Sequence, residues 1–204
     1  MNKWLVTATI ALAFSINFAQ AAGNADEGKA KSTVCAGCHG ADGNSGINPL
    51  WPKLAGQHPQ YIEKQLKDFQ ADRRADPLMS SMAKPLSEQD IANLAAYFSS
   101  QAKKIGTAAD AEIAAKGEKI FRAGNPATGV VACMACHGPT GAGNPLALFP
   151  ALNGQNAAYV EKALKDFRSA TRTNDTAKMM QGVVARMTDD EIASVAQYIQ
   201  GLSQ

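Results

Sequence analysis

The chain contains the pentapeptide Cys35-Ala-Gly-Cys38-His39, and a second version, Cys133-Met-Ala-Cys136-His137, follows further along. These two segments contain all four cysteines of the 204 residues. A C-x-x-C-H run is typical of covalent haem c attachment, because two thiols on one helical turn can reach the two vinyl groups of a porphyrin. The adjacent histidine then lies beneath the iron as its proximal ligand. The sequence therefore predicts two haem c groups, with these cysteines as attachment points and His39 and His137 as iron ligands.

Three other uses of paired cysteines fit the sequence less well. A thioredoxin-like pair is typical of a βαβ context, which the glycine-rich stretch after each motif does not supply. A four-cysteine zinc site would require both pairs to converge and would leave both histidines without a role. Disulfides are compatible with an exported protein, but they do not explain why a histidine follows each second cysteine.

Residues 1–21 have the features of a secretory signal peptide. Residues 1–3 are a short basic start, residues 4–18 are largely apolar, and Ala19 and Ala21 occupy the two positions that a signal peptidase reads. The apolar run is too short for a membrane span, although an uncleaved anchor is the alternative. No other segment is apolar enough to cross a bilayer. We therefore expect a periplasmic protein whose mature chain starts near Ala22.

An internal repeat divides the rest of the chain. Pro52 and Pro150 lie 98 residues apart, which is also the offset between the two cysteine motifs, and further identities follow at this offset as far as Phe69 and Phe167. From Ile91 and Ile192 onward the offset is 101, so the second copy has three extra residues somewhere after Phe167. The repeat predicts a duplicated unit, with domains at 22–100 and 110–204 and an exposed linker at 101–109.

Each unit is predicted to be all-α, with three helices around a loop-rich middle. The first helix is expected near 26–33 and again near 110–122. The middle helix has apolar residues at helical spacing, and the last helix begins at a capping signal, at Ser87 or at Thr188. The expected apolar faces of the middle helices are Tyr61, Ile62, Leu66 and Phe69, and Tyr159, Val160, Leu164 and Phe167.

Composition adds two expectations. The formal charge of +2 includes the basic start of the chain, so the remainder is close to neutral and no nucleic-acid partner is predicted. Units of this size build only a small core from side chains. We therefore expect each covalently held haem to serve as part of the core, and the protein without haem to fold poorly.

The repeat also selects the second axial ligand of each iron. The candidates were Met79, Met82 and His58 in the first unit and Met179, Met180 and Met187 in the second. At the offset of 101, only Met79 and Met180 have a methionine partner in the other copy. Both are expected in an irregular segment between the middle and last helices, where a loop can fold over the haem. A thioether opposite a histidine fills both axial positions, which favours electron transfer over catalysis at the metal.

The remaining candidates have plainer interpretations. Met82, Met134, Met179 and Met187 are predicted to fill gaps in the core. His58 corresponds to Asn156, so a surface position or a helix start is expected. A backbone carbonyl near Pro52 or Pro150 can accept the N–H of the proximal imidazole, although a rigid turn explains the prolines equally well.

The whole chain after the signal peptide resembles the dihaem class I cytochromes c, and specifically the cytochrome c4 family. The similarity covers the two C-x-x-C-H units, Pro-Lys-Leu-Ala-Gly-Gln at 52–57, the stretch 167–175, Met-Gln-Gly-Val at 180–183 and the ending at 198–202. The resemblance implies two tandem all-helical class I cytochrome c domains packed face to face, each wrapped around one covalent haem. It also implies His39 with Met79 and His137 with Met180 as axial ligand pairs, and propionate contacts across the domain interface.

By this resemblance the protein is expected to be a periplasmic electron carrier and not an enzyme. Its expected redox partners are a quinol-cytochrome c oxidoreductase and a haem-copper terminal oxidase, and peripheral membrane association is compatible with that role. The alternative is a dihaem redox enzyme, of the thiosulfate-oxidising or peroxidase type, with one open or altered axial position. A non-redox haem sensor would likewise need an open iron.

Overall fold

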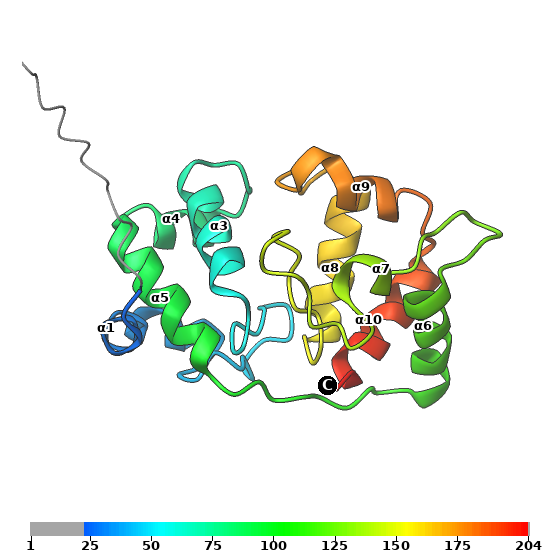
Figure 1. The fold of residues 1–204 in the computed structure, drawn as a ribbon, viewed down its shortest axis with the longest axis horizontal. Coiled ribbons are helices and arrows are strands. Elements are labelled where there is room, and N and C mark those ends of the chain that lie inside the picture. Colours follow the sequence, from blue (N-terminus) through cyan, green and yellow to red (C-terminus); the bar gives the residue numbers. More distant parts are fainter. Residues whose placement is uncertain (1–22, 204) are drawn as a thin grey trace, which may run out of the picture.

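The computed structural model describes residues 23–203, and the predicted signal peptide lies outside them. The described chain forms two helical halves that lie side by side, joined by an extended segment along one edge (Figure 1). The first half contains α1 (Ala25–Lys31), α2 (Thr33–His39), α3 (Pro59–Gln70), α4 (Pro77–Ala83) and α5 (Glu88–Ser100). The second contains α6 (Ala111–Ala123), α7 (Met134–His137), α8 (Ala157–Arg168), the short 3₁₀ helix η1 (Thr176–Lys178), α9 (Met179–Val184) and α10 (Asp189–Gly201).

The first and last helices of each half pack in close contact. Gly28 of α1 lies against the backbone of Asn93 in α5, where an added Cβ would come within 2.0 Å of the carbonyl oxygen. Gly117 of α6 lies in the same way against Ser194 of α10, at 1.9 Å. Only glycine permits this approach, so one glycine in each half fixes how its first helix crosses its last.

The last helices carry the predicted capping boxes. The side chains of Ser87 and Asp90 close the start of α5, and those of Thr188 and Glu191 close the start of α10, each pair bonding to the other's backbone N–H. These bonds satisfy N–H groups that have no partner within the helix. The core of each half lies along these two helices, where Ile91 and Ile192 are fully buried.

The described chain is all-helical, with two isolated β-bridges in place of strands. The prediction of an all-α fold is confirmed, but the expectation of three helices per unit is incomplete. The structure adds short helices at each cysteine motif and at each candidate methionine. Their four to seven residues are too few to show a helical period in the sequence.

The three extra residues of the second half lie between α8 and α9. Helix α8 ends at Arg168, 98 residues after Gln70, whereas α10 begins at Asp189, 101 residues after Glu88. This segment contains η1, where Ala177 and Lys178 have positive φ angles of 53° and 55°. The insertion therefore lengthens the connection to α9 without changing the flanking helices.

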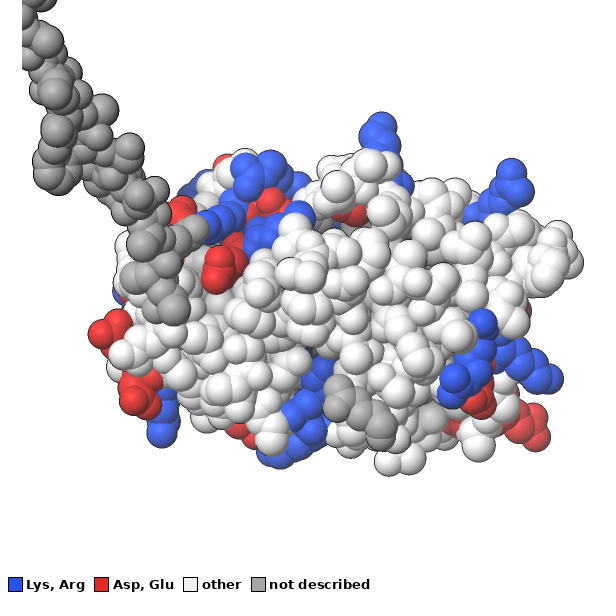
Figure 2. Space-filling view, viewed as in Figure 1, with Lys and Arg blue, Asp and Glu red and all other residues white. Residues whose placement is uncertain are grey.

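None of the helices in residues 23–203 is long and apolar enough to span a bilayer. Figure 2 shows that the face in view has few charged side chains across its middle, while lysine, arginine and acidic side chains gather toward its edges. This face has no continuous basic surface.

Candidate haem-binding sites

Each cysteine motif lies on one turn of helix. Helix α2 contains Cys35, Cys38 and His39, while in the second half Cys133 caps α7, which contains Cys136 and His137. None of the four cysteines forms a disulfide. Burial raises the pKa of Cys35, and burial raises that of Cys133 to about 11.

The two histidines are buried and oriented by the same contact. Nδ1 of His39 lies 2.9 Å from the carbonyl oxygen of Pro52, and Nδ1 of His137 lies 2.9 Å from that of Pro150. Since a carbonyl can only accept, each Nδ1 carries the proton and donates it, leaving Nε2 with a free lone pair. Burial lowers the pKa of both imidazoles, which favours the neutral form that a metal requires. Of the two explanations that the sequence left open for Pro52 and Pro150, the structure shows the carbonyl contact.

The two paired methionines lie on the short helices, not in the irregular loop that was expected. Met79 is the third residue of α4, whose start is capped by the side chain of Asp76. Met180 is the second residue of α9 and packs, partly buried, against the core of the second half. A helix fixes the direction of a side chain more firmly than a loop does.

The other candidate side chains divide into confirmed and wrong predictions. Met187 is buried in the core at 4% exposure and Met134 packs partly buried against it, as expected. Met82 and Met179 were predicted to fill the core, but they are 45% and 41% exposed. Each lies on the outer side of a short helix that the sequence did not reveal. His58 does lie at the start of α3, as expected.

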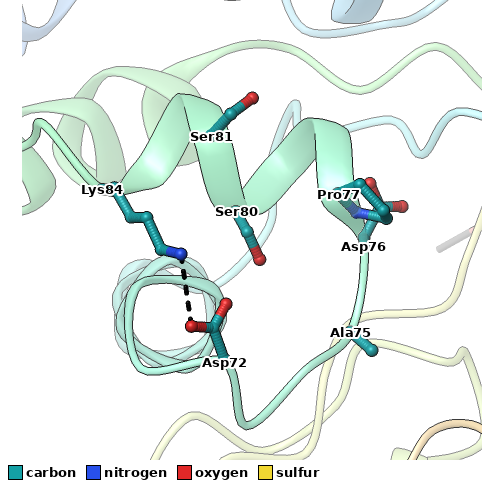
Figure 3. A pocket seen from close by; sticks show the side chains of 7 residues that line it. All are labelled: Asp72, Ala75, Asp76, Pro77, Ser80, Ser81 and Lys84. Atoms are coloured by element: carbon teal, nitrogen blue, oxygen red, sulfur yellow. Dashed lines mark ion pairs between the residues drawn. The ribbon is translucent and has the colours of Figure 1, made fainter.

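Neither a shared metal site of the four cysteines nor the surface pocket beside α4 matches the predicted ligands. Within residues 23–203, no three cysteine, histidine or acidic side chains gather as a metal cluster would require, so the cysteine pairs do not converge on one ion. A surface pocket of about 350 Å³ lies beside α4, where Asp72 and Lys84 form a 3.2 Å ion pair across it (Figure 3). Its lining contains none of the predicted ligands.

Two glutamines connect the halves close to the histidines. The amide of Gln155 accepts from the backbone N–H of Lys53 at 2.8 Å and donates to the carbonyl of Lys53 at 2.9 Å. In the opposite direction, Gln57 accepts from the N–H of Ala151 and donates to its carbonyl, both at 2.9 Å. Both glutamines are buried. The two glutamines match in the internal repeat, but nothing in the sequence indicates that each bonds across the interface.

Helix-start residues also reach across the interface. Nε2 of His58 lies 2.8 Å from the carbonyl oxygen of Ala142, and the side-chain amide of Asn156 donates to the carbonyl of Trp51 at 2.9 Å. Two positions that begin equivalent helices therefore both bind the other half.

Arginines and tyrosines form a third set of contacts. Arg74 donates to the hydroxyl of Tyr159 at 3.1 Å, and the buried Arg172 donates to that of Tyr61 at 2.9 Å. Both guanidinium groups also bond to the side-chain oxygen of Gln65. Burial opposes ionisation of Tyr159, but the two arginines outweigh it and lower its pKa to about 8. The interface is therefore polar and hydrogen-bonded.

The residues present fit a covalently attached haem in each half. Each half offers two cysteines that form no disulfide and lie on one turn, a buried imidazole whose Nε2 makes no protein hydrogen bond in the described structure, and a methionine on a separate short helix. This donor set is the one that haem c attachment and His/Met ligation require.

The comparisons with known proteins agree with this geometry. The family model described as cytochrome c matches residues 25–102 and 114–203. A cytochrome c4 from Thiocapsa roseopersicina is 55% identical over 184 residues, covering 89% of this chain and 94% of the relative. The chain belongs to the cytochrome c4 family. It therefore has two cytochrome c domains, two covalent haem c groups and a role as a dihaem electron-transfer protein.

Two further comparisons extend the likeness. The crystal structure of reduced recombinant cytochrome c4 from Pseudomonas stutzeri superimposes with a TM-score of 0.85 at 47% identity, covering 89% of this chain and all of that one. A protein of Thiomonas intermedia strain K12, named thiosulfate dehydrogenase electron acceptor, is 39% identical over 83% of this chain and 78% of its own length.

Proposed function

We propose that this member of the cytochrome c4 family carries single electrons in the periplasm, from a quinol-oxidising complex to a haem-copper terminal oxidase. The observation that supports this role is the pair of equivalent donor sets, each with a buried histidine and a methionine. When bound, each haem iron supplies a one-electron redox couple. If both axial positions of each iron are filled, no substrate can bind at the metal. We therefore propose that the protein is a carrier and not an enzyme.

The residues have distinct roles in this proposal. Cys35, Cys38, Cys133 and Cys136 hold the two porphyrins by thioether bonds. His39 with Met79, and His137 with Met180, would bind the two irons. The carbonyls of Pro52 and Pro150 fix the imidazole tautomers by the 2.9 Å contacts. A ligand set that stays the same in both oxidation states keeps the structural change on electron transfer small.

Export is part of the proposal, and it depends on residues 1–21 acting as a signal peptide cleaved near Ala22. Mass spectrometry of the periplasmic fraction tests it. A mature chain beginning near Ala22, with the added mass of two haem groups, is expected. A cytoplasmic chain that retains its first residues would contradict it.

The electron-transfer role is tested by stopped-flow mixing of the purified holoprotein with its proposed partners. The reduced quinol-cytochrome c oxidoreductase should reduce both haems, and membranes containing the terminal oxidase should reoxidise them. The 39% identity to a thiosulfate dehydrogenase electron acceptor favours thiosulfate dehydrogenase as a second candidate electron donor. The same mixing experiment should therefore be repeated with thiosulfate dehydrogenase in place of the quinol-cytochrome c oxidoreductase. If thiosulfate dehydrogenase reduces the haems and the quinol-cytochrome c oxidoreductase does not, thiosulfate dehydrogenase is the donor. Oxidation of thiosulfate by this protein unaided would contradict the carrier role.

A further inference from the structure

A single peptide group links each proximal histidine to the opposite half of the molecule. The carbonyl of Pro52 and the N–H of Lys53 belong to the same peptide group. The carbonyl accepts the Nδ1 proton of His39 at 2.9 Å, while the N–H donates to the side-chain oxygen of Gln155 at 2.8 Å. The hydrogen bonds therefore form one chain, from Gln155 in the second half to His39 in the first.

The second half has the mirror arrangement. The peptide group between Pro150 and Ala151 accepts the Nδ1 proton of His137 and donates its N–H to Gln57, both at 2.9 Å. Both glutamines are less than 9% exposed, so water does not compete freely for these bonds. The same connection thus occurs twice, and in each case the glutamine belongs to the other half.

Hydrogen bonds that share a peptide group strengthen one another. An acceptor on the N–H polarises the peptide and makes its carbonyl oxygen a better acceptor, by roughly 10–30% per bond. A better acceptor draws the Nδ1 proton and makes the imidazole a stronger electron donor to its metal. A stronger donor stabilises the ferric state and lowers the reduction potential.

We infer that Gln155 and Gln57 are positioning residues that tune the reduction potential of the haem in the opposite domain. Gln155 acts through Pro52–Lys53 on the His39 site, and Gln57 acts through Pro150–Ala151 on the His137 site. Each domain thereby sets part of its neighbour's potential. This inference rests on the proposed ligand roles of the two histidines.

The test is the variant Gln155→Leu in the full-length holoprotein. Loss of the acceptor should raise the reduced-to-oxidised ratio of the first haem two- to threefold at a fixed electrode potential. At 59 mV per tenfold change in this ratio, the reduction potential of that haem rises by about 20–30 mV. The second haem should be unchanged. The NMR resonance of the His39 Nδ1 proton in the reduced protein should move upfield, while that of His137 stays in place. Gln57→Leu should give the mirror result.

Two variants separate this effect from general damage to the interface. Gln65→Leu removes a buried interface amide that bonds to Arg74, Arg172 and Asn174 and has no link to a proximal histidine. It should leave both Nδ1 resonances in place. Gln155→Glu keeps an oxygen acceptor for the Lys53 N–H and adds negative charge, so it should not raise the first potential.

The proposal is overturned if Gln155→Leu shifts neither site, shifts the second site, or acts like Gln65→Leu. The NMR spectrum of the wild-type protein distinguishes a failure of this proposal from a failure of the ligand assignment. Nδ1 resonances without the ring-current shift of an iron-bound imidazole would overturn that assignment, and this proposal with it. Shifted resonances that Gln155→Leu leaves unmoved would overturn the cross-domain link alone.

Discussion

At the residue scale, Met179 and Met180 are neighbours in sequence with different surroundings. Met179 is 41% exposed, whereas Met180 packs, partly buried, against the core of the second half. Both lie in the first turn of α9, so they point in different directions from the same short helix. Only the inward one has a methionine counterpart in the other half.

Met180→Ala should open the second iron while leaving haem attachment intact. Carbon monoxide should then bind one haem of the reduced protein quickly, and the potential of that haem should fall by on the order of 100 mV, because a thioether favours ferrous iron. Spectroelectrochemistry and flash photolysis measure both effects. The control Met179→Ala should behave like the wild type. An unchanged potential with no carbon monoxide binding would remove Met180 from the ligand set.

The sequence alone leads to the prediction of the cysteine and histidine ligands, because a five-residue motif that occurs twice is specific. It also predicted that a proline carbonyl could hold each imidazole, but a turn explained the prolines equally well. Only the structure showed the 2.9 Å contacts. The exposure of Met82 and Met179 could not be predicted, because it depends on helices too short to give a periodic pattern.

At the element scale, the close crossing of α6 over α10 depends on one glycine. A Cβ at Gly117 would lie 1.9 Å from the carbonyl oxygen of Ser194, which is backbone and cannot rotate away. Gly117→Ala should therefore lower the free energy of unfolding by about 1–3 kcal/mol as the helices move apart. Denaturation of the holoprotein by guanidinium chloride measures the change.

Gly182 in α9 is the matched control for that substitution. An added Cβ there meets no atom within 4 Å, and alanine suits a helix better than glycine. Gly182→Ala should thus raise the free energy of unfolding, by up to about 1 kcal/mol. If both variants lost stability equally, the close crossing would not be the cause.

At the scale of the whole molecule, the two halves meet through polar contacts that include several cations. Nζ of Lys103 donates to the side-chain oxygen of Asn153 at 2.9 Å, and Nζ of Lys53 donates to the carbonyl of Gly154 at 2.8 Å. Both lysines thus bind neutral oxygens of the second half. The sequence had placed Lys103 in an exposed linker, and it could not show that the side chain turns back toward the interface.

This arrangement predicts that stability rises with pH in the alkaline range. Burial, with a smaller effect of Lys53, lowers the pKa of Lys103 from its ordinary 10.5 to about 8. Between these values the folded state binds fewer protons than the unfolded state, so the free energy of unfolding should increase from about pH 8 to about pH 10.5. Tyr159, whose pKa is lowered to about 8, adds to this rise between about pH 8 and pH 10. Lys103→Met should therefore reduce the rise without abolishing it, whereas Lys104→Met, at an exposed lysine paired with Asp42, should leave the rise unchanged. A rise of unchanged size in Lys103→Met would contradict the contribution of Lys103.

The carrier role depends on a histidine and a methionine as the axial ligands of both irons. The most direct measurement is the far-red sulfur-to-iron charge-transfer band of the ferric protein, normalised to its covalent haem content. The proposed ligand pairs predict an intensity equal to two methionine-ligated haems. Intensity for one haem or none would mean an open or differently ligated iron, and the protein would then not be a simple electron carrier.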